Sequence, residues 1–301
     1  MKVPFLTQDE IHYGIIEQIS PKIRKILSEN PSPFTYHGTG TFIVGRGEVA
    51  VIDPGPVNQE HIDAILSALE GEVITHIVIT HTHRDHSPGA ALLVEKTGAQ
   101  VVGGVPILAD NFGDTEEIVA IVGKVFDLDY APDRILQDGD RISGKDWTLE
   151  AVFTPGHCSN HLCYYLKEEN ALFSGDHVMG WSTTVIAAPD GNMAHYMDSL
   201  RKLLDLNVDI LYPTHGPKIE KPERFIRALM MHRRMREEQI LKALNKSGPL
   251  TIAGLVDKLY VKTPKGLKKA AYRTVMAHLI DMQARRLVNV NGDLYHAIST
   301  D

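Results

Sequence analysis

Four short apolar segments lie far apart in the chain, and each is followed by a turn that carries histidine or aspartate. The segments are VITHIVIT at 73–80, TLEAVF at 148–153, ALFSG at 171–175 and ILYP at 210–213. Apolar runs of this length, bounded by Gly or Pro, predict buried β-strands. The side chains that follow them sit on a rigid frame, and they are His81, His157, Asp176 and His215. Four strand ends that deliver ligand-type residues are hard to explain by chance or packing, so the pattern favours a metal site.

The turn after the first of these strands is crowded with possible ligands. The stretch ITHTHRDHSPG at 79–89 carries His81, His83, Asp85 and His86. Histidines at positions i and i+2 just past a strand, with Asp and His following, can converge on one spot. Taken alone, the turn is also compatible with a polar loop of solvated histidines, and the three later segments favour ligands. Ser87 and Pro88 are typical of an N-cap and a first helical residue, so a helix is predicted directly after the turn.

The first two thirds of the chain alternate strands with helices. Residues 40–45 and 48–53 predict a strand pair, and Ile62, Ile65 and Leu69 have helical spacing. This alternation predicts an α/β body with sheets in the core and helices as covers.

The last part of the chain has a different layout. Helices are predicted at 233–246, 250–260 and 267–288, and the sequence LVNVNGDLYHA at 287–297 predicts two short strands around Asn-Gly-Asp. Three helices followed by a small β-wing form the winged-helix layout.

The distribution of charge supports two modules. The segment from His232 to Asp301 holds 13 Lys and Arg against 6 Asp and Glu, whereas the first 231 residues hold 18 against 32. Such a division suggests modules with different partners. We therefore predict a catalytic domain at 1–225 and a winged-helix domain at 226–301, and leave open whether a helix from Pro222 crosses that boundary.

Composition limits the cellular setting. No apolar run reaches the roughly 18 residues needed to span a bilayer, and the start MKVPFLTQDE lacks the apolar core of a secretory signal. The two cysteines, Cys158 and Cys163, make no disulfide framework. We expect a cytoplasmic protein without a membrane partner, and leave the oligomeric state open.

The motif His81-x-His83-x-Asp85-His86, completed by His157, Asp176 and His215, resembles the ligand set of the metallo-β-lactamase superfamily. This resemblance covers residues 20–220 and implies an α/β fold, an αββα sandwich, ahead of the winged-helix domain. It also implies two metal ions. The ligands it implies are His81, His83 and His157 for one ion, Asp85, His86 and His215 for the other, and Asp176 as the bridge.

The ligand types define the chemistry that the resemblance implies. Imidazole and carboxylate suit zinc, and iron or manganese stay open. Two divalent ions can acidify a shared water, so a metal-bridging hydroxide is the expected nucleophile. Asp85 is the predicted catalytic residue, because it would orient that hydroxide as well as bind one ion. No Ser or Cys nucleophile is needed, and Cys158 is interpreted as a small packed side chain.

Several residues near the motifs allow two interpretations. Asp53 in VIDPG is similar to a superfamily aspartate that supports the ligand loop, and it could also be only a turn former. His161 is interpreted as a hydrogen-bonded structural histidine. His195 and Tyr196 could border the substrate pocket or could belong to helix packing.

The substrate is less constrained than the site, because fold and metal site do not determine it. The segment SGDHVMGWSTTVIAAPDGNMAHYMDSLRKL with PTHGP and the winged-helix tail resembles the lactamase-beta-2-like group, which includes endoribonucleases that prefer single strands. We therefore predict hydrolysis of a phosphodiester, single-stranded RNA. The alternative is a small thioester, ester or β-lactam. A regulator with a structural metal site is disfavoured, since such a site needs only four ligands.

Basic residues in the tail bear on the RNA prediction. They gather at the expected start of the third helix, where a basic stripe would contact phosphates. A solvated face that only borders the cleft is the alternative. The predicted contacts are Lys265, Lys268, Lys269 and Arg273, with Lys262 nearby.

Overall fold

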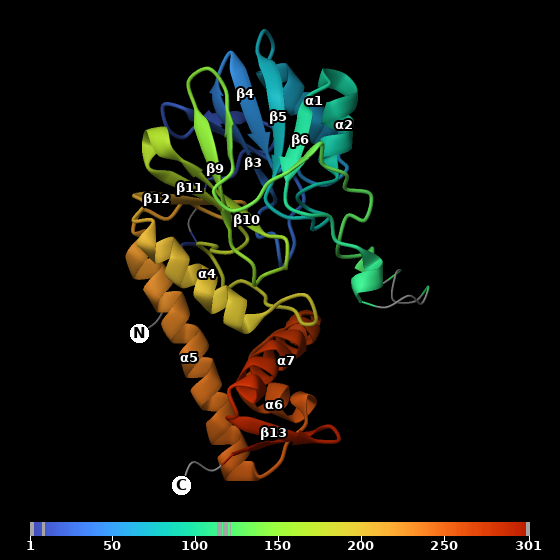
Figure 1. Cartoon of the computed structure of the whole chain (residues 1–301), viewed down its shortest axis with the longest axis vertical. Helices are drawn as coiled ribbons and strands as arrows, with labels where there is room; N and C mark the ends of the chain where they lie inside the picture. The colour runs from blue at the N-terminus through green and yellow to red at the C-terminus, as the bar shows by residue number, and fades with distance from the viewer. Residues whose placement is uncertain (1–2, 8–9, 113–115, 117–119, 121, 299–301) are drawn as a thin grey trace.

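Two β-sheets pack face to face, and helices cover both outer faces (Figure 1). The computed structural model describes residues 3–7, 10–112, 116, 120 and 122–298. The first sheet has the strand order β1-β2-β3-β4-β5-β6-β7. Its strands are β1 (Ile16–Gln18), β2 (Ile23–Leu27), β3 (Gly40–Arg46), β4 (Glu48–Ile52), β5 (Val73–Ile79), β6 (Gln100–Gly103) and β7 (Arg134–Ile135).

The second sheet has the order β12-β11-β10-β9-β8. Its strands are β8 (Arg141–Ser143), β9 (Thr148–Phe153), β10 (Leu162–Leu166), β11 (Ala171–Gly175) and β12 (Ile210–Pro213). Two parallel pairs matter for the site, namely β4 with β5 in the first sheet and β11 with β12 in the second. Because the strands of a parallel pair end at the same edge, each pair places two following turns side by side.

The space between the sheets is filled by large apolar side chains. The rings of Phe42, Phe173 and Tyr212 meet there, with centroids 5.2 to 5.9 Å apart. Tyr164 is fully buried in the same layer, and its hydroxyl donates across the sandwich to the carbonyl of Ile79 at 2.7 Å. Burial of this layer is the main force that holds the two sheets together.

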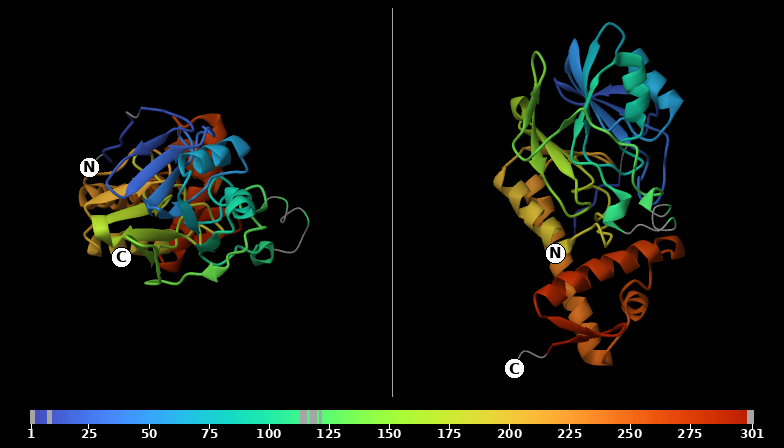
Figure 2. Two further views of the ribbon diagram at one scale, coloured as in Figure 1. Left: turned by 90° about the horizontal axis from the view of Figure 1, so that it is seen from above. Right: turned by 45° about the vertical axis from the view of Figure 1, so that its right-hand side comes forward.

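The outer faces have separate cores. Helices α1 (Gln59–Ala68) and α2 (Gly89–Thr97) cover the first sheet, and α4 (Met193–Asp205) with the start of α5 (Pro222–Ser247) covers the second. Figure 2 shows this layering from two further sides. The predicted αββα sandwich is therefore confirmed.

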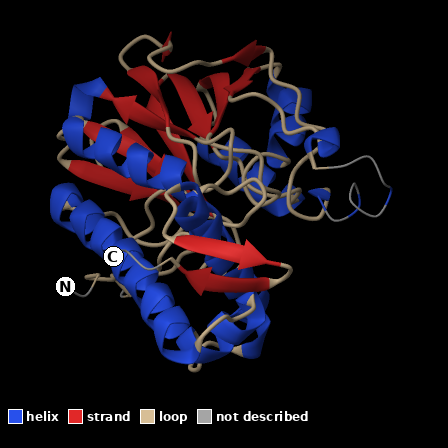
Figure 3. Ribbon diagram, turned by 60° about the horizontal axis from the view of Figure 1, so that its bottom comes forward, coloured by secondary structure: helices blue, strands red, loops and turns tan. Residues whose placement is uncertain are grey.

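The C-terminal part folds as the predicted winged helix. It contains α6 (Ile252–Leu259), α7 (Lys268–Ala284) and a hairpin of β13 (Val288–Asn291) with β14 (Leu294–Ala297). Figure 3 shows the hairpin apart from the two large sheets. Its core joins Leu255 and Val275 to Ile240 and Leu244 of α5.

Helix α5 belongs to both parts of the molecule. Its first turns place Phe225 and Leu229 in the core behind the second sheet, and its last turns place Ile240 and Leu244 in the winged-helix core. The predicted domain boundary between residues 225 and 226 falls within this continuous helix. The division of the chain into two domains at that point stays a prediction.

Three local expectations differ from the structure. Helix α2 begins at Gly89, and the Ser87 hydroxyl donates to Asp127 at 2.7 Å instead of capping it. Helix α7 begins at Lys268, after a 3₁₀ turn at Lys265–Leu267, and ends at Ala284. It stops before the predicted 288 because the chain must reverse into β13, with Arg286 at a φ of 58°.

Candidate metal centre

The structure brings all seven predicted ligand residues together, beside the carboxyl ends of the parallel pairs β4–β5 and β11–β12. Asp53 and His81 follow the parallel strands β4 and β5, while Asp176 and His215 follow β11 and β12. Possible ligand atoms lie within 4.8 Å of one another in three groups. The groups are His81 with His83 and His157, Asp85 with His86 and His215, and His81 with His86 and Asp176.

Three imidazole nitrogens meet in the first group. His83 Nδ1 lies 2.9 Å from His81 Nε2 and 3.1 Å from His157 Nε2. Asp176 approaches this group, with Oδ2 at 3.7 Å from His157 Nε2. Three ring nitrogens aimed at one point suit a metal ion, because each offers a lone pair when neutral.

In the second group, the Asp85 carboxylate lies beside the imidazoles of His86 and His215, and the Asp176 carboxylate approaches the same two rings. Asp85 Oδ2 lies 3.2 Å from His215 Nε2 and 3.7 Å from His86 Nε2. Asp176 Oδ1 lies 3.4 Å from His215 Nε2 and 3.7 Å from His86 Nε2. The two oxygens of Asp176 therefore face different groups, as a bridging carboxylate requires.

In three of the candidate ligand histidines, His86, His157 and His215, the ring nitrogen Nδ1 is hydrogen-bonded to an oxygen. His86 Nδ1 lies 2.8 Å from Asp53 Oδ2, His215 Nδ1 lies 2.9 Å from the Gly38 carbonyl, and His157 Nδ1 lies 2.7 Å from the Val185 carbonyl. A ring that donates through Nδ1 keeps Nε2 for a metal, and such partners fix its orientation.

Three buried atoms at the centre have no hydrogen-bond partner within the part of the chain that the structure describes. They are His86 Nε2, His215 Nε2 and Asp176 Oδ1. Leaving buried polar atoms unsatisfied costs free energy, and such atoms are rare in folded proteins. All three point to one location and are nitrogen or oxygen donors, so the residues present fit divalent cations.

The electrostatics of the two groups differ. Burial and the neighbouring imidazoles hold the pKa of His81 well below its usual value, and the same causes lower the pKa of His83 to about 3. Burial also acts against the charged form of His86, but the carboxylates of Asp85, Asp176 and Asp53 outweigh it and raise its pKa well above the usual value. His81 and His83 are therefore neutral imidazoles at neutral pH, whereas the carboxylates around His86 favour positive charge there.

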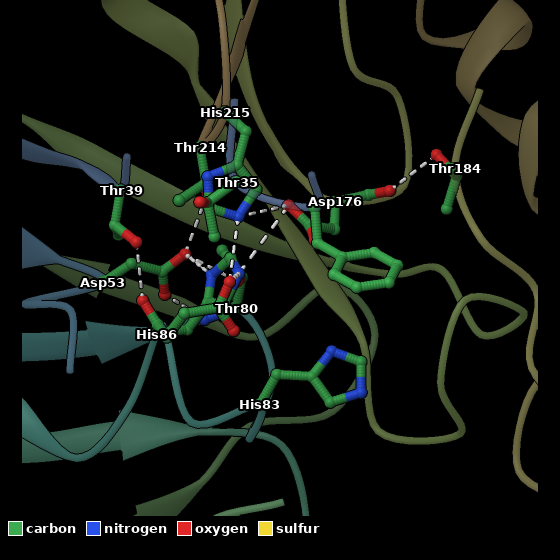
Figure 4. A network of polar contacts seen from close by, with 12 residues as sticks. Thr35, Thr39, Asp53, Thr80, His83, His86, Asp176, Thr184, Thr214 and His215 are labelled. Carbon is green, nitrogen blue, oxygen red and sulfur yellow. Dashed lines mark hydrogen bonds and ion pairs between the residues drawn. The ribbon is translucent and has the colours of Figure 1, made fainter. Parts of the chain in front are cut away.

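Asp53 is hydrogen-bonded to the loops that carry several candidate ligands (Figure 4). Its carboxylate accepts hydrogen bonds from the Thr80 amide at 2.8 Å, the Thr80 hydroxyl at 2.7 Å and the Thr214 hydroxyl at 3.0 Å, besides His86. The residue is fully buried and has a φ of 49°, a conformation that aspartate tolerates better than most residues. One carboxylate therefore links the ends of β4, β5 and β12.

Four other histidine, cysteine and tyrosine predictions can be placed. His161 is buried, with Nδ1 2.9 Å from the Thr154 hydroxyl and Nε2 accepting from the Asp176 amide, as a structural histidine does. Cys158 is buried, and burial raises the pKa of its thiol well above the usual value. Tyr196 is buried and packs against the His177 ring, whereas His195 is exposed near the start of α4.

Gly156 directly precedes His157 and lies against the backbone of Tyr196, and its replacement by alanine is expected to damage both stability and metal binding. A Cβ there would overlap the backbone of Tyr196, and the φ of 142° disfavours side chains. Gly139 provides a matched control, since its φ is 82° but nothing lies within 4 Å of an added Cβ. We expect Gly139→Ala to cost about 1 kcal/mol from strain and Gly156→Ala clearly more, measured by urea denaturation. Equal losses would show that His157 does not depend on this close contact.

The basic residues of the tail are only partly free. Arg273 Nη1 donates to the Ala188 carbonyl at 2.8 Å, and Lys268 Nζ lies 3.2 Å from Asp257 Oδ1. Lys265 and Lys269 are exposed. The Arg273 contact ties α7 to the loop before α4 (Figure 1), which makes Arg273 part of the packing between the two parts of the chain.

The sequence matches the family described as the metallo-beta-lactamase superfamily over residues 35–215, and the beta-lactamase associated winged helix domain over residues 251–296. The chain therefore belongs to the metallo-beta-lactamase superfamily, whose members are hydrolases, and its fold implies divalent metal ions. In the described part of the chain, no helix has the length and apolar character needed to cross a bilayer.

Individual relatives resemble nearly the whole chain. The Beta-lactamase-like protein 2 homolog of Caenorhabditis elegans is 34% identical over 88% of this chain and 85% of its own length. The Atrochrysone carboxyl ACP thioesterase of Aspergillus fumigatus is 31% identical over 90% and 83%. A solved beta-lactamase domain protein from Burkholderia ambifaria shares the fold, with a TM-score of 0.82, 20% identity and coverage of 98% and 97%.

Proposed function

We propose that this protein is a dinuclear metal-dependent hydrolase that cleaves acyl thioesters. The observation that carries the proposal is Asp176, whose two oxygens face two separate groups of ligand atoms. His81, His83 and His157 would hold one ion, Asp85, His86 and His215 the other, and Asp176 both. When bound, two such ions supply an activated water and neutralise negative charge on the attacked carbonyl.

The chain's own residues would contribute orientation and proton handling. Asp85 is more exposed than Asp176, with 29% of its side chain accessible against 10%, so it can contact both substrate and solvent. The neighbouring His86 and His215 keep its pKa well below the usual value in spite of burial, so it is ionised at neutral pH. An ionised carboxylate in this position can orient an attacking water and pass its proton toward the leaving thiol.

The thioester is favoured over RNA for two reasons. Relatives that match most of the chain are named as thioesterase or lactamase-like proteins, which supports the alternative prediction better than the phosphodiester. Two of the four basic residues predicted to contact RNA are engaged within the protein, Arg273 with Ala188 and Lys268 with Asp257. The remaining exposed pair, Lys265 and Lys269, is a small surface for a phosphate backbone.

Metal content and a substrate panel test this proposal together. Purified protein should contain about two divalent ions per chain, and zinc suits the nitrogen and oxygen ligands best, with iron and manganese measured alongside. An acyl-coenzyme A thioester, single-stranded RNA and a chromogenic cephalosporin are then assayed side by side. We expect metal-dependent thioester cleavage, unchanged in a Lys265→Ala/Lys269→Ala double variant. RNA cleavage that this double variant loses, without thioester cleavage, would overturn the substrate assignment.

A further inference from the structure

A buried arginine of α5, Arg233, has no acidic partner among the described residues. Arg233 lies in the middle of α5, and only 4% of it is exposed. Among the residues that the structure describes, no ion pair includes it, and its Nε has no hydrogen-bond partner. Burying an unpaired charge is unfavourable, so an apolar side chain would serve packing alone better.

The guanidinium contacts Thr184 and Tyr196, which lie on two segments near the candidate ligands. Its Nη2 donates to the carbonyl of Thr184, and its carbon atom Cζ lies 5.1 Å from the centre of the Tyr196 ring. The ring of this tyrosine also packs against the ring of His177, with centroids 4.6 Å apart. Cation–π contact and one charged hydrogen bond partly offset the cost of burial.

Thr184, the residue that this arginine contacts, also contacts the predicted ligand Asp176 (Figure 4). The Thr184 hydroxyl lies 2.8 Å from the Asp176 carbonyl and 3.1 Å from that of His177, so it holds the turn that carries Asp176. The next residue, Val185, offers the carbonyl that orients His157 at 2.7 Å. Thr184 and Val185 thus form a short strap that positions one ligand from each side.

We propose that Arg233 is a positioning residue that fixes this strap and thereby the geometry of Asp176 and His157. The inference rests on the proposed metal site. Helix α5 is suited to the task because its two ends are anchored in different cores, which leaves its centre little freedom to move. The contact also makes the metal centre depend on a helix that is shared with the winged-helix domain.

The test measures the affinity of metal-free protein for Zn²⁺ by competition with a chromogenic chelator. Arg233→Met removes the charge and the hydrogen bond while keeping a long side chain, and Arg234→Met is the control on the exposed face of the same helix. We expect Arg233→Met to bind Zn²⁺ about tenfold more weakly, as for other groups that orient ligands, and Arg234→Met to match the wild type. The melting temperature of the metal-free Arg233→Met protein should lie within about 5 °C of the wild type or above it.

Two results would overturn the inference. Wild-type Zn²⁺ affinity in folded Arg233→Met would remove Arg233 from the site. If Arg233→Met does not fold, or melts more than about 5 °C below the wild type, Thr184→Val tests the strap from the other side, and wild-type affinity there rejects the idea. Failure of the wild-type protein to bind Zn²⁺, iron or manganese would instead reject the proposed metal site itself.

Discussion

Replacing Asp85 with alanine is expected to lower kcat/KM for an acyl thioester by about a thousandfold, while the protein stays folded. The Asp85 carboxylate is more accessible than that of Asp176 and lies 3.2 Å from His215 Nε2. Its loss removes both a proposed ligand and the group that would direct the attacking water. Its backbone carbonyl still accepts from Thr39, which preserves the turn. Steady-state kinetics with measured metal content check the prediction.

A second aspartate controls for the substitution itself. Asp63 lies exposed on α1, and Asp63→Ala should leave turnover and metal content unchanged. If Asp85→Ala keeps turnover within about threefold of the wild type at full metal loading, Asp85 takes no part in the chemistry. The proposed role would then have to pass to another group.

Replacing Asp53 with alanine is expected to destabilise the metal-free protein by about 3–5 kcal/mol. Four donors converge on this buried carboxylate, three of them from Thr80 and Thr214 at the ends of β5 and β12 and one from His86, and alanine would leave all of them without an acceptor. Urea denaturation measures the loss. Because His86 would lose the group that orients its ring, affinity for divalent metal should also fall about tenfold or more.

Graded variants make the Asp53 prediction sharper. Thr214→Val removes one of the four donors and should cost about 1 kcal/mol. Asp53→Asn keeps the shape and tolerates the φ of 49°, so it should lie between Thr214→Val and Asp53→Ala. If Asp53→Ala loses less free energy of unfolding than Thr214→Val does, the four hydrogen bonds do not act together.

The candidate ligands could be predicted because each lies directly after a strand. His81, His157, Asp176 and His215 all follow short apolar runs, and the crowded turn supplies His83, Asp85 and His86 within six residues. Parallel pairing of β4 with β5 and of β11 with β12 then brings the strand ends together.

The partners that orient the ligands could not be predicted in the same way. His157 and His215 bind the backbone carbonyls of Val185 and Gly38, and every residue has a carbonyl. Only the folded chain selects which one is close. The burial of Arg233 could not be predicted for a related reason, since its position in a charged helix suggests a solvated side chain.

The tail shows the opposite problem, because its composition suggested more than its structure supports. Thirteen Lys and Arg residues after His232 favoured a nucleic-acid surface. In the folded chain, Arg273 closes the contact with Ala188, and Arg285 pairs with Glu237 and Asp281. A count of charged residues in a sequence does not distinguish side chains that make contacts within the protein from side chains that are free to bind a nucleic acid.

The continuity of α5 restricts how the chain can change in length. Adding one residue to a helix turns everything beyond it by about 100° and moves it by about 1.5 Å along the axis. An insertion between Leu229 and Ile240 would therefore carry α7 away from the loop at Ala188, while both cores remained intact. Related chains that keep the contact should vary in length in their loops, or change this helix only by numbers of residues that restore its phase.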